Sequence, residues 1–305
     1  MRILISGASG FLGSALVPRL EAGGHAVTRL VRHPSTSAGE IAWDPARGGL
    51  VASAIEGFDG VVNLSGEAIA DRRWSKARKQ GLWNSRVEST RLLSETLARL
   101  ERRPRVLVSM SAVGFYGDRG DEELTEASRE GKGFLPQLAG AWEQAAEPAR
   151  RSGVRVVHPR AGLVLAAHGG ALARLLTPFR LGVGGPIGAG RAWWSWIALA
   201  DAVAALEFAL CHESLAGPVN LVAPIPVRNG EFARTLARTL SRPAVLPAPR
   251  ALLRLMFGEM ADEALLASAR VLPAKLLAAG YAFRFPRLAE ALRDVLGRPA
   301  IGAAA

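Results

Sequence analysis

Three glycines near the start of the chain have the spacing of a loop that binds phosphate. Gly7, Gly10 and Gly13 follow directly after the apolar run over residues 2–6, and a helical pattern begins at Ser14. In such a loop one glycine permits the tight turn, one lets backbone N–H groups approach a pyrophosphate, and one lets the helix pack on the strand. Unpaired N–H groups and the dipole at a helix N-terminus favour negative charge there. The pattern predicts a dinucleotide site, and a glycine-rich turn without a ligand is the alternative.

The residue after the next strand indicates which dinucleotide would bind. The strand expected over residues 26–31 is followed by Arg32 and His33, and the next acidic residue is Glu40. Proteins that bind NAD usually place Asp or Glu here to hold the ribose 2′-hydroxyl, whereas a guanidinium suits a 2′-phosphate. We therefore predict NADP, with Arg32 on the 2′-phosphate. The alternative is that Arg32 is simply one more charged residue exposed to solvent and binds no cofactor.

A serine and a tyrosine after a later strand are the candidates for catalysis. Ser111 ends the apolar run over residues 105–111, and Tyr116 follows shortly after it. A serine in this position can hydrogen-bond a substrate oxygen beside a nicotinamide and so position it. Tyr116 is the candidate proton donor. A serine that merely ends a strand and a tyrosine packed in the core are the alternatives.

The elements that must position these residues indicate an α/β fold with a doubly wound parallel sheet. Short apolar strands alternate with amphipathic helices along most of the chain. Strands are expected over residues 2–6, 26–31, 40–45, 58–66, 105–111, 154–158 and 218–222. Helices are expected over residues 14–22, 82–100, 138–151, 199–210, 228–240, 250–258, 262–271 and 288–296, with a charged loop over 118–132. Ligands of such sheets bind outside the carboxyl ends of the strands, which predicts that Leu64 and Ser65 line the cofactor.

The order of these elements predicts three structural parts. Residues 1–165 are expected to form a Rossmann domain that binds NADP, with residues 190–222 contributing to it. Residues 166–189 and 223–248 are expected to form a smaller substrate subdomain. Residues 249–297 are expected to form a C-terminal helical module.

Composition limits the classes of protein that fit. The chain has 305 residues, of which 49% are hydrophobic, without a run of apolar residues long enough to cross a membrane. It begins with a strand pattern rather than a signal peptide, so we expect a cytoplasmic protein with no membrane partner. Its one cysteine, Cys211, excludes internal disulfides and cysteine-based metal clusters, and its apolar neighbours predict an inert thiol in the core. No metal is expected.

The net charge of +11 raises the question of whether the protein binds nucleic acid. Arginine outnumbers lysine along the whole chain, and the densest basic cluster spans residues 72–79, with Arg86 beyond it. Basic clusters interleaved with aromatic residues can follow a nucleic acid backbone. This cluster follows a strand and is expected to face the same end of the sheet as the glycine loop. A cofactor or an anionic small molecule is therefore favoured over nucleic acid.

Several motifs together resemble the extended short-chain dehydrogenases/reductases, and within them the atypical epimerase-like branch. The matching segments are the loop Gly7–Gly13, Val62–Glu67, Ser111–Gly117, Trp142–Glu143, Pro178–Gly188 running on to Trp196–Ile197, Pro226–Ala233, and a C-terminal stretch with Pro273–Leu276 and Gly280–Phe283. The resemblance covers nearly the whole chain. It implies an NADP-binding Rossmann domain, a smaller substrate domain, and a substrate cleft lined by the glycine-dense segment 182–190 and the tryptophans after it. The cofactor contacts that it implies are Gly7, Ser9, Gly10, Phe11, Leu12, Gly13, Arg32, Leu64, Ser65, Arg86 and Arg160.

The chain departs from the wider superfamily in its acid–base residues. Active members carry Tyr-x-x-x-Lys on the helix after the catalytic serine, in which the lysine lowers the pKa of the tyrosine. The residues four places after the only two tyrosines, Tyr116 and Tyr281, are Gly120 and Phe285. Aligning Glu143 with a glutamate that often follows the lysine places Leu135 and Ala139 at the tyrosine and lysine positions. Proton transfer by the usual pair is therefore not expected.

These observations lead to two hypotheses about function. The first is an NADP(H)-dependent oxidoreductase or epimerase-like enzyme that acts on a small polar carbonyl or sugar-nucleotide-like substrate through Ser111. The second is a catalytically silent NADP(H)-binding protein that senses or regulates. We expect a monomer or a homodimer.

Overall fold

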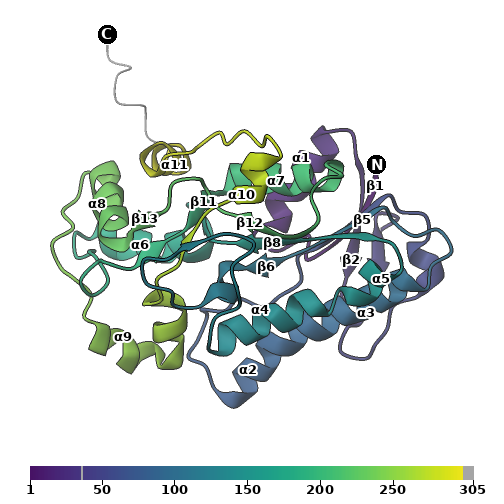
Figure 1. Cartoon of the computed structure of the whole chain (residues 1–305), viewed down its shortest axis with the longest axis horizontal. Helices are drawn as coiled ribbons and strands as arrows, with labels where there is room; N and C mark the ends of the chain where they lie inside the picture. The colour runs from purple at the N-terminus through teal and green to yellow at the C-terminus, as the bar shows by residue number, and fades with distance from the viewer. Residues whose placement is uncertain (36, 298–305) are drawn as a thin grey trace, which may run out of the picture.

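A parallel β-sheet with helices on both faces forms the larger part of the molecule (Figure 1). The structure is a computed structural model that describes residues 1–35 and 37–297. The strand order is β12-β8-β5-β4-β1-β2-β3, and the short strand β6 also pairs with β8. The strands are β1 (Arg2–Ser6), β2 (Ala26–Val31), β3 (Glu40–Ala42), β4 (Gly60–Asn63), β5 (Val106–Ser109), β6 (Ser111–Ala112), β8 (Arg155–Ala161) and β12 (Gly217–Leu221). This order confirms the predicted doubly wound α/β fold.

Successive residues of the central strands point to opposite faces of the sheet and pack in different cores. Leu4, Val61 and Leu107 pack against α3 and α5, whereas Ile3 and Val62 belong to the core that includes α1 and α7. Figure 1 shows α1 and α7 on one side of the sheet and α3, α4 and α5 on the other. The bounds are α1 (Gly13–Ala22), α3 (Ser89–Ala98), α4 (Phe134–Gln144), α5 (Glu147–Arg151) and α7 (Leu199–Cys211). Burial on both faces explains why the central strands read as continuous apolar runs.

A smaller lobe beside the carboxyl ends of the strands has its own apolar core. Leu172, Trp196, Phe232 and Leu292 belong to this second core. The lobe contains β9 (Leu163–Leu165), α6 (Gly170–Arg180), β10 (Trp193–Trp194), β11 (Trp196–Ala198), β13 (Val227–Arg228), α8 (Asn229–Leu240) and α11 (Leu288–Val295). Helix α9 (Arg250–Phe257) lies at its outer margin in Figure 1, and α10 (Ala274–Ala278) packs near β12. The division into three parts stays a prediction.

Two of the expected helices are interrupted. The helix expected over 82–100 begins earlier, as α2 (Lys76–Trp83), because the Ser75 hydroxyl accepts a hydrogen bond from the Arg78 backbone N–H at 3.1 Å. It then passes through a π-helical turn, η2 (Asn84–Glu88), before α3 begins. The helix expected over 138–151 is two helices, α4 and α5, and Pro148 lies in the first turn of the second one. Proline has no N–H to donate and fits only that first turn, which explains the break.

Two further expectations were wrong. Residues 262–271 form a π-helical turn, η4 (Ala261–Leu265), and a strand, β14 (Arg270–Val271), rather than a helix. Strand β14 pairs with β7 (Glu123–Leu124), inside the segment that was expected to be loop, and such distant pairing leaves no local sequence signal. Cys211 is exposed at the last residue of α7, not buried in the core. The remaining short elements are the 3-10 helices η1 (Ala52–Ile55) and η3 (Val113–Tyr116).

The C-terminal segment caps the helix that runs beneath the candidate site. Helix α4 begins after Gly133 and has no cap from its own N-cap side chain. The Glu263 carboxylate, on η4, accepts hydrogen bonds from the backbone N–H groups of Phe134 at 2.9 Å and Leu135 at 2.7 Å. A carboxylate at a helix N-terminus satisfies orphan donors and interacts favourably with the helix dipole. Residues more than 120 positions away therefore fix the start of α4.

We expect Glu263→Gln to lower the free energy of unfolding by about 1–2 kcal/mol, because it removes the charge and turns an amide N–H₂ toward a backbone N–H. Urea titration followed by circular dichroism measures this. The matched control is Glu259→Gln, which breaks an exposed ion pair with Lys79 and should cost less than about 0.5 kcal/mol. Equal stability of the Glu263 variant and the wild type would show that the cap contributes nothing.

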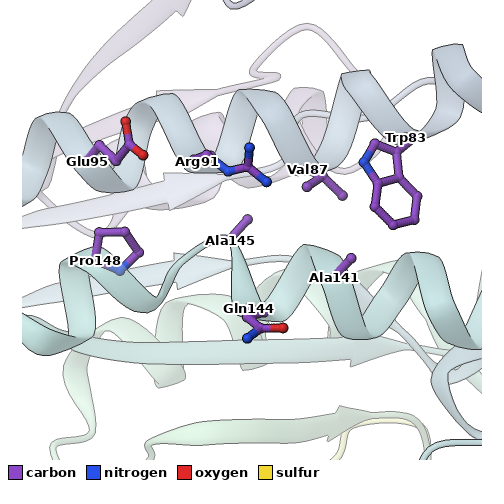
Figure 2. Close-up of a pocket in the computed structure, with 8 residues that line it drawn as sticks. All are labelled: Trp83, Val87, Arg91, Glu95, Ala141, Gln144, Ala145 and Pro148. Atoms are coloured by element: carbon purple, nitrogen blue, oxygen red, sulfur yellow. The ribbon is translucent and has the colours of Figure 1, made fainter.

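Two surface grooves lie away from the glycine loop. One, of about 270 Å³, runs between α3 and α4 and is lined by residues such as Trp83, Arg91 and Gln144 (Figure 2). The other, of about 570 Å³, lies at the amino ends of the strands near Met1 and Arg105. Within residues 1–35 and 37–297, no helix is long and apolar enough to cross a membrane. The same residues contain no group of His, Cys, Asp and Glu side chains arranged to hold a metal ion.

Candidate functional site

The glycine loop is a close-packed turn in which side chains would not fit. Gly7 has φ +70°, and a Cβ on it would lie 2.7 Å from the Leu64 carbonyl oxygen. A Cβ on Gly13 would overlap the carbonyl oxygens of Gly7 and Ala8. The Gly10 N–H donates to the Gly7 carbonyl at 3.0 Å, which closes the turn. The loop thus needs glycine at Gly7 for its backbone conformation and at Gly13 for the close approach of helix and strand.

The first turn of α1 is open toward the loop. The N-cap residue is Leu12, and no side chain caps the helix there. Gly10 and Ser9 are exposed, whereas Gly13 is buried. A helix N-terminus without a side-chain cap leaves backbone N–H donors for an anion, and the dipole favours the same charge. The backbone thus offers a cradle of the kind that holds a pyrophosphate.

Phe11 joins the loop to the smaller lobe. A Cβ on Gly169 would lie 2.5 Å from the Phe11 ring, and one on Gly170 would lie 3.2 Å from it. The ring therefore lies directly against the backbone where α6 begins. Sequence reasoning did not single out Gly169 and Gly170, although a glycine pair immediately before a helix was a usable signal for close approach.

A buried polar network links the carboxyl ends of β1, β4 and β5. Register pairs Ser6 with Asn63, and Asn63 with Ser109. Asn63 accepts a hydrogen bond from the Ser6 hydroxyl at 2.6 Å and donates to the Ser109 hydroxyl at 3.2 Å. Its amide also donates to Thr90 at 2.7 Å. The network holds the ends of three neighbouring strands in fixed relation.

Leu64 and Ser65 lie beside the glycine loop. The Leu64 carbonyl faces Gly7, as its distance from a Cβ at that glycine shows. The Ser65 hydroxyl donates to the Ser6 hydroxyl at 2.9 Å, and the Ser65 N–H donates to the Asn63 side chain at 3.2 Å. The structure therefore brings these two predicted residues to the loop. Whether they touch a cofactor stays a prediction.

Arg32 follows β2 at the same end of the sheet. Strand β2 pairs with β1 so that Leu30 is opposite Ser6, and Arg32 lies two residues beyond this pair. Its side chain is exposed. An exposed guanidinium at the tip of the strand next to the glycine loop can reach an anion bound there.

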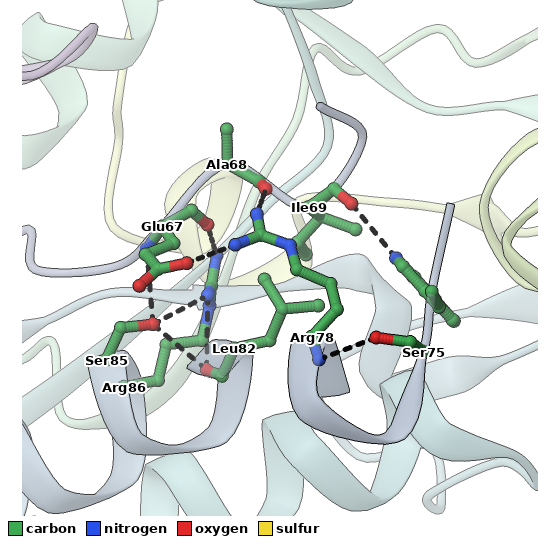
Figure 3. A network of polar contacts seen from close by, with 9 residues as sticks. Glu67, Ala68, Ile69, Ser75, Arg78, Leu82, Ser85 and Arg86 are labelled. Carbon is green, nitrogen blue, oxygen red and sulfur yellow. Dashed lines mark hydrogen bonds and ion pairs between the residues drawn. The ribbon is translucent and has the colours of Figure 1, made fainter. Parts of the chain in front are cut away.

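Arg86 is buried beneath the segment after β4 rather than open to solvent (Figure 3). Its guanidinium donates to the backbone carbonyls of Glu67 at 2.7 Å and Leu82 at 3.3 Å, and it lies over the Trp142 ring. Burial lowers the pKa of Arg86 to about 10, against the opposing effect of the Glu67 carboxylate, so the group is still charged at neutral pH. Arg86 and its neighbour Val87 are both buried within the π-helical turn η2.

Arg78 supports the same segment from α2. Figure 3 shows its guanidinium between the Glu67 carboxylate and the Ala68 carbonyl, and it donates to both. The Nε atoms of Arg78 and Arg86 are both buried without a hydrogen-bond partner among the described residues. The two arginines therefore hold the backbone over residues 67–68. The contact between Arg86 and a cofactor stays a prediction, and the geometry shows a role in fixing this segment.

Ser111 and Arg160 share one carboxylate. The Ser111 hydroxyl donates to Glu143 Oε1 at 2.7 Å. The Arg160 guanidinium donates to Oε1 at 2.7 Å and to Oε2 at 2.8 Å, a bidentate pair whose members are both largely buried. Burial alone would lower the pKa of Arg160, but the Glu143 carboxylate and the Tyr116 side chain together outweigh it and the pKa is raised. Arg160 thus has a structural partner, and its contact with a cofactor stays a prediction.

Tyr116 lies behind Arg160 and is fully buried. Its hydroxyl donates to the Asn220 side chain at 2.6 Å and accepts from Arg160 at 3.0 Å. Burial raises the pKa of Tyr116 above its usual value, and the positive charge of Arg160 offsets this only in part. These contacts favour the alternative of a packed core tyrosine over a proton donor.

We expect Tyr116→Phe to lower the free energy of unfolding by about 2 kcal/mol, because it leaves buried donors and acceptors on Arg160 and Asn220 unpaired. NADPH affinity should change by less than about twofold, since no cofactor contact is proposed for this side chain. Tyr281→Phe is the control, because within residues 1–35 and 37–297 that hydroxyl makes one hydrogen bond, to the Asp201 carbonyl at 2.9 Å, and its loss should cost less. A Tyr116 variant as stable as the wild type would contradict the structural role.

The helix next to Ser111 carries no acid–base pair. Leu135 and Ala139 of α4, the positions aligned with the usual tyrosine and lysine, are both buried and apolar. Leu135 lies close to Gly114, where a Cβ would be 3.3 Å from the Leu135 Cβ. Glu143 is the ionisable residue of α4 that contacts Ser111. The sequence indicated Glu143 only through its alignment with the superfamily motif. Its partners Ser111 and Arg160 lie on strands β6 and β8, so their contact with α4 has no local sequence signal.

Comparisons with known proteins agree with this arrangement. The sequence model of the NAD dependent epimerase/dehydratase family matches residues 3–221, and that of a domain of unknown function, DUF1731, matches residues 248–295. The chain is 43% identical to an epimerase family protein of Mycobacterium bovis over 97% of this chain and 98% of that one. It is 38% identical to the human epimerase family protein SDR39U1 over 97% of this chain and 100% of that one.

Solved structures match over the same length. The crystal structure of human SDR39U1 with NADPH superposes with a TM-score of 0.90 at 37% identity, covering 98% of this chain and 100% of that one. A nucleoside-diphosphate sugar epimerase from Corynebacterium glutamicum gives a TM-score of 0.81 at 34% identity, covering 97% of this chain and 58% of that one. The glycine cradle, the polar strand ends and these matches together place the chain in the NAD dependent epimerase/dehydratase family, with a C-terminal DUF1731 domain.

Proposed function

We propose that the protein binds NADP(H) and acts as an oxidoreductase or epimerase-like enzyme on a small polar carbonyl or sugar-nucleotide-like substrate. The observation that carries the proposal is the glycine cradle, in which a Cβ at Gly7 or Gly13 would overlap backbone, beside an exposed Arg32 at the tip of β2. The structure of human SDR39U1 with NADPH supports the choice of cofactor.

The residues of this chain fit the cofactor. The backbone of the loop and the uncapped first turn of α1 would hold the pyrophosphate. Arg32 would hold the 2′-phosphate, and the segment of Leu64 and Ser65 would border the nucleotide. When bound, the cofactor would supply or accept a hydride at its nicotinamide ring.

Ser111 and Glu143 are the polar groups that we assign to the reacting end. Because the Ser111 proton points to Glu143 at 2.7 Å, the oxygen of Ser111 keeps lone pairs for a substrate hydroxyl. Glu143 would thus orient the serine, and Arg160 would hold Glu143 in place. This arrangement would position a substrate hydroxyl, which donates its proton to the Ser111 oxygen, without the tyrosine and lysine that α4 lacks.

NADPH oxidation against a panel of carbonyl compounds and sugar nucleotides tests the proposal. Turnover that Ser111→Ala abolishes, with NADPH affinity unchanged, is the expected result. Ser53→Ala is the control, since Ser53 is an exposed serine of η1, which precedes β4 and lies outside the proposed cofactor site. Equal turnover in wild type and Ser111→Ala would remove Ser111 from the mechanism.

A catalytically silent NADP(H)-binding protein is the second candidate. The observation that favours it is the burial of Ser111 and Tyr116 together with the apolar Leu135 and Ala139 on α4. Retention of NADPH without turnover of any compound in the panel would support this candidate over the enzyme.

A further inference from the structure

Exposed aliphatic side chains gather on one margin of the smaller lobe. Leucine and valine residues project from the loop after α6 and from the connection between α8 and α9, and a leucine and methionine stripe projects from α9 itself. These residues, the aliphatic surface, are Leu181, Val183, Val245, Leu246, Leu252, Leu255 and Met256. Leu181 and Leu255 are each 73% exposed. Soluble proteins expose single apolar residues routinely, but a gathering of this kind marks an interaction site.

The two loops of this surface are held side by side. The Ala248 N–H donates to the Pro186 carbonyl at 2.8 Å, and the Gly188 N–H donates to the Ala248 carbonyl at 2.9 Å. Gly185 lies so close to the Leu246 carbonyl that a Cβ would overlap it. In Figure 1 the connection from α8 runs down the outer margin of the molecule to α9. The loop residues and α9 therefore belong to one margin of the fold.

Helix α9 contributes an apolar stripe that the fold does not cover. It has no buried residue. Leu252, Leu255 and Met256 share one face at the spacing i, i+3, i+4, and all three are exposed, whereas Leu253 and Phe257 on another face are half-buried. A helix that only packed on its own domain would turn its apolar residues inward.

Arginine is the predominant charged residue in the segments that form the aliphatic surface. Residues 234–258 contain five arginines and no aspartate or glutamate. Residues 172–200 contain Arg174, Arg180 and Arg191 and also lack acidic residues. Asp71 and Asp262, which pair with Arg174 and Arg254, come from outside these segments. Aliphatic side chains with arginines around them are complementary to a layer that has an apolar interior and anionic groups at its surface.

These features fit a lipid bilayer better than another protein. A second copy of the same surface would bring arginines against arginines, which opposes a two-fold contact. The residues that dominate protein interfaces are enriched in Trp, Tyr and Arg, and the aliphatic surface contains no Trp or Tyr. Neither groove described above is lined by a residue of the aliphatic surface.

We propose that the aliphatic surface, with α9 of the DUF1731 domain at its edge, docks the protein on the surface of an anionic lipid membrane. The side chains of Leu252, Leu255 and Met256 enter the boundary between headgroups and acyl chains, and the neighbouring arginines contact lipid phosphates. Sequence analysis predicted no membrane partner from the lack of a spanning segment. A helix that lies on the surface needs no such segment. The proposal does not depend on the function of the nucleotide site.

Vesicle co-sedimentation of the full-length protein tests this proposal. The vesicles contain phosphatidylcholine alone or mixed with phosphatidylglycerol, at low and at physiological salt. We expect binding to the mixed vesicles, weakened by salt, and a loss of at least about tenfold in affinity for the L252S/L255S/M256S variant. The control L277S removes an exposed leucine of α10, outside the surface, and should bind like the wild type. Because α9 buries no residue, the triple variant should keep the melting temperature of the wild type.

Three outcomes would overturn the proposal. Failure of the wild type to bind the mixed vesicles at low salt would do so directly. Equal binding by the triple variant would assign the attraction to the net charge of +11 alone. A wild-type dimer in light scattering that the triple variant converts to a monomer would make the aliphatic surface an interface between two copies.

Discussion

Replacing Arg32 by alanine is expected to weaken NADPH binding by about 10- to 100-fold and to leave NADH binding within about twofold. The expectation follows from charge-assisted hydrogen bonds to the 2′-phosphate, each of which contributes about 1.5–3 kcal/mol. NADH lacks that phosphate and therefore loses nothing. Arg32 follows β2 and is exposed, so its removal should not disturb the fold.

Isothermal titration with both cofactors measures this difference in one experiment. Arg29→Ala is the matched control. Arg29 lies on β2, the strand that Arg32 follows, and it pairs with Glu21 near the end of α1 at 4.0 Å. The control should bind both cofactors like the wild type. An equal loss of NADPH and NADH affinity in the Arg32 variant would contradict the assignment of the 2′-phosphate.

Replacing Gly13 by alanine is expected to abolish measurable cofactor binding and to destabilise the fold. The added Cβ would overlap two backbone carbonyl oxygens, those of Gly7 and Ala8, so either the loop or the start of α1 must move. Overpacking in a well-packed region typically costs about 1–3 kcal/mol. The loop that moves is the one that presents N–H groups to the pyrophosphate, so affinity and stability should fall together.

Gly81→Ala is the control for this substitution. Gly81 lies inside α2, and a Cβ there would be 3.7 Å from the Glu67 carboxylate, an ordinary contact. Alanine in a helix is favoured over glycine by about 0.5–1 kcal/mol, so the control should be as stable as the wild type or more so. Thermal melts with and without NADPH measure both effects. Full NADPH affinity in the Gly13 variant would show that the loop tolerates the side chain and that the cradle is misassigned.

The sheet and the glycine loop were predictable because their signals are local. The loop Gly7–Gly13 follows β1 directly, and each central strand is an apolar run ended by polar residues. The hydrophobic pattern also gave α7, α8 and α11 nearly to the residue. It missed the π-helical turn between α2 and α3, because such a turn changes the period without a glycine or proline to mark it.

The side-chain partners of the site were not predictable from the sequence. Glu143, Arg160 and Tyr116 meet only because α4, β8 and η3 pack together. Ser111 and Arg160 were each expected near the cofactor, but nothing local shows that they share a carboxylate. Likewise Arg86 was expected to contact the cofactor, and only the structure shows that its guanidinium donates to the Glu67 carbonyl. Burial and partner choice at such positions depend on tertiary packing.

The central claim is that the opening loop, the first turn of α1 and Arg32 form an NADP(H) site. Titration calorimetry of the purified protein with NADPH and with NADP⁺, at low salt, tests it most directly. We predict saturable binding of at least one redox form, at least about tenfold tighter than that of the matching NAD form. The absence of any binding heat with both NADPH and NADP⁺, together with no shift of the melting temperature by either, would contradict the claim.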